Sequence, residues 1–215
     1  LTASAWQIVI AGTVFFAGIY LIYGCLTWLL TERLLPAWGI GRKLDPRPLT
    51  KGQWQREIGL SLLSILIFGV GLLLPWGLLR LGWVNLALEP SAVQVILETL
   101  VLLLWNEVHF YITHRLLHTP WLRQFHLAHH RSVVTTPWST YSFHPVESFL
   151  LGAVLPLALL AHAFSPWALL GLTLMSLLLN VSGHLPHERL RKAAPARLRT
   201  LSSRRRRTAP RRPAR

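Results

Sequence analysis

The sequence has little cysteine and little charge, and each shortage excludes a class of protein. Cys25 is the only cysteine among 215 residues. A single cysteine excludes an internal disulfide and a metal cluster held by several thiolates. Charged residues make up only 14% of the chain, whereas soluble domains average about 25%. With 52% hydrophobic residues and a mean hydropathy of +0.42, the composition favours an integral membrane protein of one domain.

Acidic side chains are also few, and the net charge of +14 is concentrated in the last part of the chain. Twelve of the 22 Lys and Arg residues lie from Arg189 onward, where no acidic residue occurs. Residues 1–188 therefore carry ten basic and eight acidic side chains. A nucleic-acid-binding protein needs a folded basic face with groove-reading or aromatic elements, and the sequence shows none. We expect no nucleic-acid partner.

Four apolar stretches predict helices in a membrane. Residues 6–30 and 58–79 each have about the ~20 apolar residues that a spanning helix needs. A third stretch, 92–105, continues as helix into a histidine-rich segment, and a fourth, 148–180, is interrupted by Pro156 and Pro166. The sequence predicts an all-α integral membrane protein with four to five transmembrane or re-entrant helices.

The Lys/Arg bias of the connecting segments predicts the orientation of these helices. Six Lys or Arg residues lie in 31–57, whereas 80–91 contains only Arg80. Because short cytoplasmic loops are enriched in Lys and Arg, we expect 31–57, the histidine-rich segment and the basic tail on the cytoplasmic side. The expected location is a bacterial inner membrane.

Five histidines fall within seventeen residues and predict a metal site. His114 and His118 are four residues apart, and His126, His129 and His130 share one helical turn. A single zinc ion takes three or four protein ligands, so five imidazoles suggest two metal ions. Imidazole suits iron, zinc, copper and nickel, so the spacing does not choose the metal.

Two further side chains follow the same helical stripe as the first histidine pair. Glu107, Tyr111, His114 and His118 recur at steps of four, three and four. Ligand histidines often donate their second ring N–H to a carboxylate, so Glu107 is a candidate for that partner or for a direct ligand. The alternative is a carboxylate at the membrane end, paired with an arginine.

The remaining histidines divide into candidate ligands and structural residues. His184 and His187 emerge at the membrane end that the topology places beside the first histidines, and both are candidate ligands. His144 fits a helix start or a loop better than a ligand. For His109 and for His162 we favour a structural role.

Several motifs together resemble the fatty acid hydroxylase / sterol desaturase superfamily. They are His114-Arg-x-x-His118, His126-x-x-His129-His130, the Phe-His-Pro-Val-Glu segment ending at Glu147, and Asn180-x-x-Gly-His184. The resemblance covers roughly 95–188 and defines a domain over 1–188, with histidine boxes in 107–130 and 180–187. It implies two iron ions, with zinc as a possible substitute. It also implies O₂ as co-substrate, a fatty acyl or sterol-like lipid that is hydroxylated or desaturated, and a ferredoxin, cytochrome b5 or reductase-like electron donor. The resemblance carries over the five histidines of 114–130 as iron ligands, with His184.

The sequence departs from this family after Glu188, where a third His-x-x-His-His box is expected. Residues 189–215 are basic and contain no histidine. Two interpretations are open: a disordered tail that binds anionic lipid, or out-of-frame translation of a GC-rich gene. A catalytically incomplete metal-binding membrane protein and a membrane zinc-dependent hydrolase are the competing functions.

The frameshift interpretation makes a prediction that gene sequencing can check. Another reading frame, within a few dozen codons after the codon for Glu188, is expected to encode His-x-x-His-His. If no frame encodes this box, the tail is not the product of a frameshift.

Overall fold

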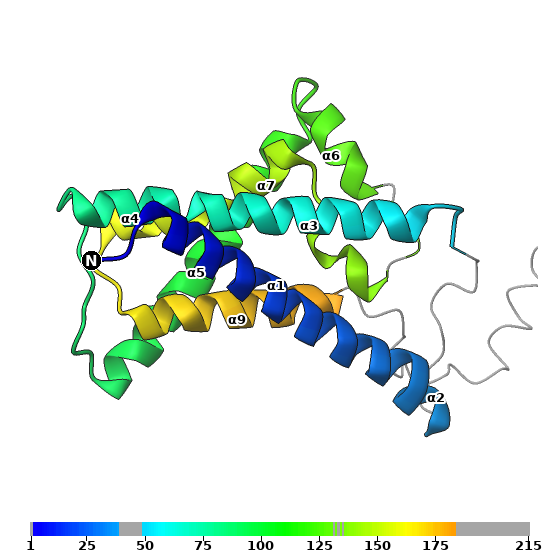
Figure 1. Cartoon of the computed structure of the whole chain (residues 1–215), viewed down its shortest axis with the longest axis horizontal. Helices are drawn as coiled ribbons and strands as arrows, with labels where there is room; N and C mark the ends of the chain where they lie inside the picture. Colours follow the sequence, from blue (N-terminus) through cyan, green and yellow to red (C-terminus); the bar gives the residue numbers. More distant parts are fainter. Residues whose placement is uncertain (1, 39–48, 131, 133, 135, 184–215) are drawn as a thin grey trace, which may run out of the picture.

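Helices make up the part of the chain that the structure describes. The computed structural model describes residues 2–38, 49–130, 132, 134 and 136–183, and of 128–129 and 180–183 the backbone alone. Within these ranges there is no strand (Figure 1). The elements are α1 (Ala5–Leu29), η1 (Leu30–Leu34), α2 (Leu35–Ala37), α3 (Gln53–Gly71), α4 (Leu73–Arg80), α5 (Ala92–Leu117), α6 (Arg123–His130), η2 (Pro137–Tyr141), α7 (Pro145–Gly152), α8 (Val154–Ala161) and α9 (Pro166–Gly183).

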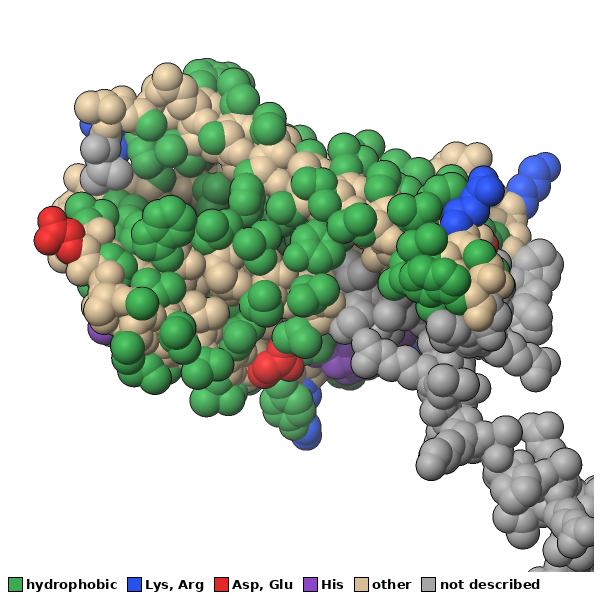
Figure 2. All heavy atoms as spheres, turned by 90° about the horizontal axis from the view of Figure 1, so that it is seen from below, with side chains coloured by type: hydrophobic (Ala, Val, Ile, Leu, Met, Phe, Trp, Pro, Cys, Tyr) green, Lys and Arg blue, Asp and Glu red, His purple; other side chains and the backbone are tan. Residues whose placement is uncertain are grey.

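Three helical segments are long and apolar enough to cross a membrane. They are Ala5–Ala37, Gln53–Arg80 and Ala92–Leu117, and two shorter apolar segments, Pro145–Ala161 and Pro166–Leu179, accompany them. Hydrophobic side chains are spread over the face shown in Figure 2, with few charged side chains among them. The all-α membrane fold is confirmed. The stretch 148–180 is divided at 162–165 into separate helices, as its prolines predict.

The helix starts follow from side chains that satisfy free backbone N–H groups. Ser4 and Gln7 form a capping box at α1, and Ser91 accepts a hydrogen bond from the Gln94 N–H at α5. At α7, His144 Nδ1 accepts from the Val146 N–H at 3.2 Å, and Pro145 occupies the first helical position. His144 is therefore a helix-start residue, as expected.

Two packed groups of side chains hold the bundle together. Ile19 and Tyr20 of α1 pack with Ile65 of α3, Tyr141 of η2 and Leu177 of α9. At the other end of the bundle, α5, α8 and α9 meet around a second core. Its buried members are Val84, Leu102, Ala158, Leu159, Phe164, Ala168 and Leu172. These contacts place α5 against α9, and α3 against η2 and α7.

The connection expected over 31–57 is partly helical at both ends. Helix continues from α1 through Ala37, and α3 already begins at Gln53. Polar residues open α3 because Gln53 and Glu57 are buried there and hydrogen-bonded to each other, with Gln53 Nε2 donating to Glu57 Oε1 at 2.7 Å. Sequence polarity suggested a solvated loop, but tertiary burial makes this segment helix.

Close packing of α1 on α3 predicts a difference between two glycines of the same helix. A Cβ added at Gly69 would lie 2.9 Å from the backbone N of Thr13, whereas one at Gly59 would meet nothing within 4 Å. We expect Gly69→Ala to lower the free energy of unfolding by about 1–3 kcal/mol because of overpacking. Gly59→Ala is the control and is expected to be neutral or stabilising, by up to about 1 kcal/mol. Denaturant unfolding in detergent micelles measures both, and equal effects would contradict the close approach.

Candidate metal site

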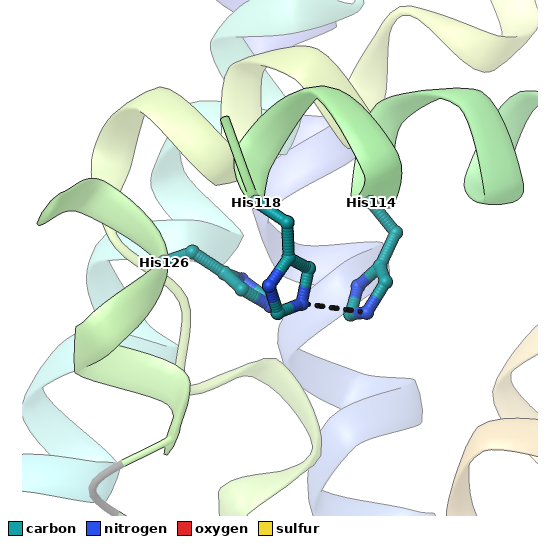
Figure 3. A group of neighbouring side chains, drawn as sticks. All are labelled: His114, His118 and His126. Carbon is teal, nitrogen blue, oxygen red and sulfur yellow. Dashed lines mark hydrogen bonds between the residues drawn. The ribbon is translucent and has the colours of Figure 1, made fainter. Parts of the chain in front are cut away.

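The C-terminal end of α5 presents two imidazoles side by side. His114 lies in the last turn and His118 caps the helix, one turn further on. Their Nε2 atoms are 3.1 Å apart (Figure 3). Two nitrogens each about 2.1 Å from one metal ion are separated by a similar distance.

Helix α6 brings the second histidine box against this pair. A tight turn connects the helices, with the Arg123 N–H donating to the Thr119 carbonyl oxygen at 2.9 Å. The His126 ring then lies 4.8 Å from the His114 ring and 4.9 Å from the His118 ring, centroid to centroid. The His130 ring lies 4.5 Å from that of His126 and 5.5 Å from that of His118. We call these four residues the histidine cluster.

The histidine cluster offers a donor set that suits a transition metal ion. One nitrogen from each of His114, His118 and His126 can be chosen so that all three lie within 4.8 Å of one another. In Figure 3 the three rings point toward a common centre, two from α5 and one from α6. Imidazole nitrogens bind iron and zinc well, and no thiolate is present.

A buried carboxylate orients one ring of the cluster. Glu147 Oε1 lies 2.9 Å from His126 Nδ1, and the two side chains are 4% and 2% exposed. This contact leaves His126 Nε2 as the nitrogen for a metal, as in the carboxylate–histidine–metal arrangement of many metalloproteins. Among the described residues no group hydrogen-bonds to Glu147 Oε2, which is also buried.

Burial raises the pKa of Glu147 to about 8, opposed by a backbone hydrogen bond at His144. A cation on the far side of the His126 ring would favour the carboxylate anion, because His126 then donates its Nδ1–H to Glu147. In the sequence, Glu147 stands out only as the last residue of the Phe-His-Pro-Val-Glu motif, and no role was predicted for it. The feature that could have indicated a role is its position as a lone carboxylate at the start of an apolar helix.

The two side chains predicted on the α5 stripe lie at the surface. The Glu107 carboxylate accepts a hydrogen bond from the Asn106 amide at 3.4 Å, and the Tyr111 hydroxyl accepts one from Arg115 at 2.8 Å. Tyr111 is 60% exposed. In the part of the chain that the structure describes, the carboxylate found in contact with a cluster histidine is that of Glu147, and Glu107 is not brought into such a contact.

The other histidines considered in the sequence either lie outside the histidine cluster or fall outside the described residues. His109 is buried on α5 with its ring 5.8 Å from that of Trp105. His162 lies beyond the cluster, 3.6 Å from Glu98. The side chain of His129, on α6, and the whole of His184 and His187 lie outside the described residues.

A comparison with protein families agrees with this geometry. The family model for fatty acid hydroxylases matches residues 99–207, about half of the chain, including the histidine cluster and Glu147. The chain belongs to the fatty acid hydroxylase family. The matched range of this fatty acid hydroxylase domain begins within α5, so α1, α3 and α4 lie before it.

Curated relatives of this fatty acid hydroxylase family member are sterol desaturases. A Delta(7)-sterol 5(6)-desaturase of Saccharomyces cerevisiae is 30% identical over 155 residues, which is 67% of this chain and 42% of the relative. An enzyme of the same name from Eremothecium gossypii is 30% identical over 137 residues, which is 60% of this chain and 39% of the relative. Another, from Gibberella zeae, is 32% identical over 116 residues, which is 51% of this chain and 35% of the relative. The chain thus spans less than half the length of these relatives. No solved structure matches it significantly.

The buried contact of Glu147 predicts a specific effect on metal binding. Glu147→Gln is expected to weaken metal affinity by about 10–100-fold, because a neutral amide replaces the carboxylate that accepts the His126 N–H. Glu107→Gln removes an exposed carboxylate of the same protein and is expected to change the metal affinity much less. Titration of the purified variants with Zn²⁺ measures both. A larger effect at Glu107 would show that the stripe on α5, and not α7, supplies the carboxylate.

Proposed function

We propose that this chain is a membrane oxidoreductase that uses iron and O₂ to hydroxylate or desaturate a lipid. The observation that carries the proposal is the convergence of four imidazoles and one buried carboxylate at the end of an apolar helix. Membership of the fatty acid hydroxylase family and similarity to sterol desaturases support the same class of reaction. A fatty acyl or sterol-like lipid is the proposed substrate.

The histidines would hold two iron ions. We assign His114, His118, His126 and His130 from the geometry of the cluster. His129, His184 and His187 complete the proposed ligand set on the sequence pattern. When bound, the iron would supply the activation of O₂ and the attack on an unactivated C–H bond.

The protein's own side chains would orient the metal ligands and bind the apolar substrate. Glu147 holds the His126 ring so that one nitrogen faces the metal position. The surface of α5 before the histidines is apolar, with Leu104 67% exposed and Val108 44% exposed, and would offer an apolar approach for a chain in the membrane. Glu107, as a direct ligand or as the partner of a ligand histidine, and Tyr111 on the same helix stay candidate site residues on the sequence pattern alone.

The proposal also includes a partner and a location. A ferredoxin, cytochrome b5 or reductase-like protein would deliver two electrons at the membrane face that carries the histidines. The Lys/Arg bias of the loops assigns that face to the cytoplasm. The relatives above come from fungi, so the choice of a bacterial inner membrane rests on the sequence expectation alone.

Metal analysis with an activity assay tests the proposal. The purified chain, loaded anaerobically with Fe²⁺, is expected to hold two iron ions, and lipid extracts incubated with O₂ and a reductant are expected to gain a hydroxyl group or a double bond. His126→Ala is expected to lose iron and product formation, whereas the control His162→Ala removes an imidazole outside the cluster and is expected to retain both. One zinc ion without O₂ consumption would contradict the proposal and favour a hydrolase.

A further inference from the structure

Helix α3 carries a line of polar side chains that is buried inside an apolar bundle. Gln53, Glu57, Ser61 and Ser64 follow one another at steps of four, four and three, so they share one face of the helix. All four are at most 1% exposed. We call this line the polar seam. Polar groups in a candidate membrane helix are costly to bury and usually have a functional reason.

The first half of the polar seam binds the chain that follows the second histidine box. Glu57 Oε2 accepts a hydrogen bond from the Thr136 hydroxyl at 2.6 Å. Gln53 Nε2 donates to the Val134 carbonyl oxygen at 2.8 Å and also to Glu57 Oε1. The start of α3 is therefore attached to residues four and six positions after His130.

The second half of the polar seam binds η2 and α7. The Ser61 hydroxyl donates to the Trp138 carbonyl oxygen at 3.0 Å, and the Tyr20 hydroxyl of α1 donates to the same oxygen at 2.9 Å. Ser64 and Ser148 share a hydrogen bond of 2.8 Å between their buried hydroxyls. Ser148 is the residue next to Glu147.

Together these contacts hold Val134, Thr136 and Trp138, which lie between His130 and Glu147, and Ser148, which follows Glu147. We infer that the polar seam of α3 positions Glu147, and through it the His126 ring, for metal binding. The inference rests on the proposed function, because it assigns the seam to the same metal site. The seam lies before residue 99, outside the range that matches the fatty acid hydroxylase family model.

Directional hydrogen bonds explain why the seam is polar and not apolar. Apolar side chains of similar volume pack a helix interface without the cost of burying a carboxylate. Such packing permits small sliding and rotation, whereas a satisfied buried polar network favours one arrangement. Since a ligand ring must be held within about 0.5 Å of its productive position, a seam that fixes the segment between Val134 and Ser148 serves the site.

Substitutions at Thr136 separate positioning from general stability. Thr136→Val keeps the shape of the side chain and removes the hydroxyl that Glu57 accepts, whereas Thr136→Ser keeps the hydroxyl. Each variant of the full chain is purified in detergent and titrated with Co²⁺, whose d–d absorption depends on coordination geometry. We expect Thr136→Val to weaken Co²⁺ binding about tenfold, in the lower range of effects known for side chains that support ligands. We expect its spectrum to change, and Thr136→Ser to remain close to the unsubstituted chain.

Three controls keep the test decisive. Glu57→Gln exchanges the carboxyl group of the seam for an amide of similar volume, and it is used in place of Thr136→Val if that variant does not fold. Glu98→Gln alters another buried carboxylate, which accepts from the Ser165 N–H in a different part of the bundle, and it is expected to leave Co²⁺ affinity unchanged. In a Glu147→Gln background, Thr136→Val is expected to cause little further loss, because both act on the same ring.

The outcomes distinguish this inference from the proposed function. If the unsubstituted chain binds Co²⁺ and the folded seam variants bind it with the same affinity and spectrum, the seam inference is overturned and the proposed function stands. An equal loss in Glu98→Gln would also overturn it, because loosening of the bundle would then be the cause. If the unsubstituted chain binds neither Co²⁺ nor iron, the proposed function fails, and the seam inference fails with it.

Discussion

The contact between His126 and Glu147 is the interaction on which the candidate site depends. It joins α6, which carries the second histidine box, to α7, which is packed into the bundle through α3. Without a partner for its Nδ1, the His126 ring could turn about its side-chain bonds and the cluster would lose its common centre. A carboxylate buried beside an imidazole is stable only when the pair is well hydrogen-bonded or when a cation lies nearby.

The same physical constraint acts throughout the apolar part of the molecule. Inside a membrane bundle no water replaces a missing hydrogen-bond partner, so a buried polar side chain is stabilised by a partner within the protein. Glu57 pairs with Gln53 and Thr136, and Glu98 accepts from Gln94 and from the Ser165 N–H at the start of α9. Each buried carboxylate thus connects segments that are distant in sequence. At the histidine end of the molecule these connections converge on the segment before Glu147.

Membership of the fatty acid hydroxylase family indicates the kind of chemistry at this site, and the structure shows which helices hold the site in place. The matched range contains the histidine cluster, but α1 and α3 lie before it and supply part of the scaffold. Tyr20 and Ser61 reach the same carbonyl oxygen from these two helices. The site lies at the end of α5, one of the three helical segments that are apolar and long enough to cross a membrane.

Apolar run length and i,i+4 spacing are local properties, so the helical membrane class and the four members of the histidine cluster can be predicted from the sequence. The carboxylate beside the cluster cannot be predicted in this way: local spacing favours Glu107, which shares a helix stripe with His114, yet the described contact to His126 comes from Glu147. The tertiary structure also made residues 53–57, expected in a loop, the start of α3, with Gln53 and Glu57 buried. Pairings across 21 residues, between His126 and Glu147, and across 79, between Glu57 and Thr136, arise from packing, which no local spacing encodes.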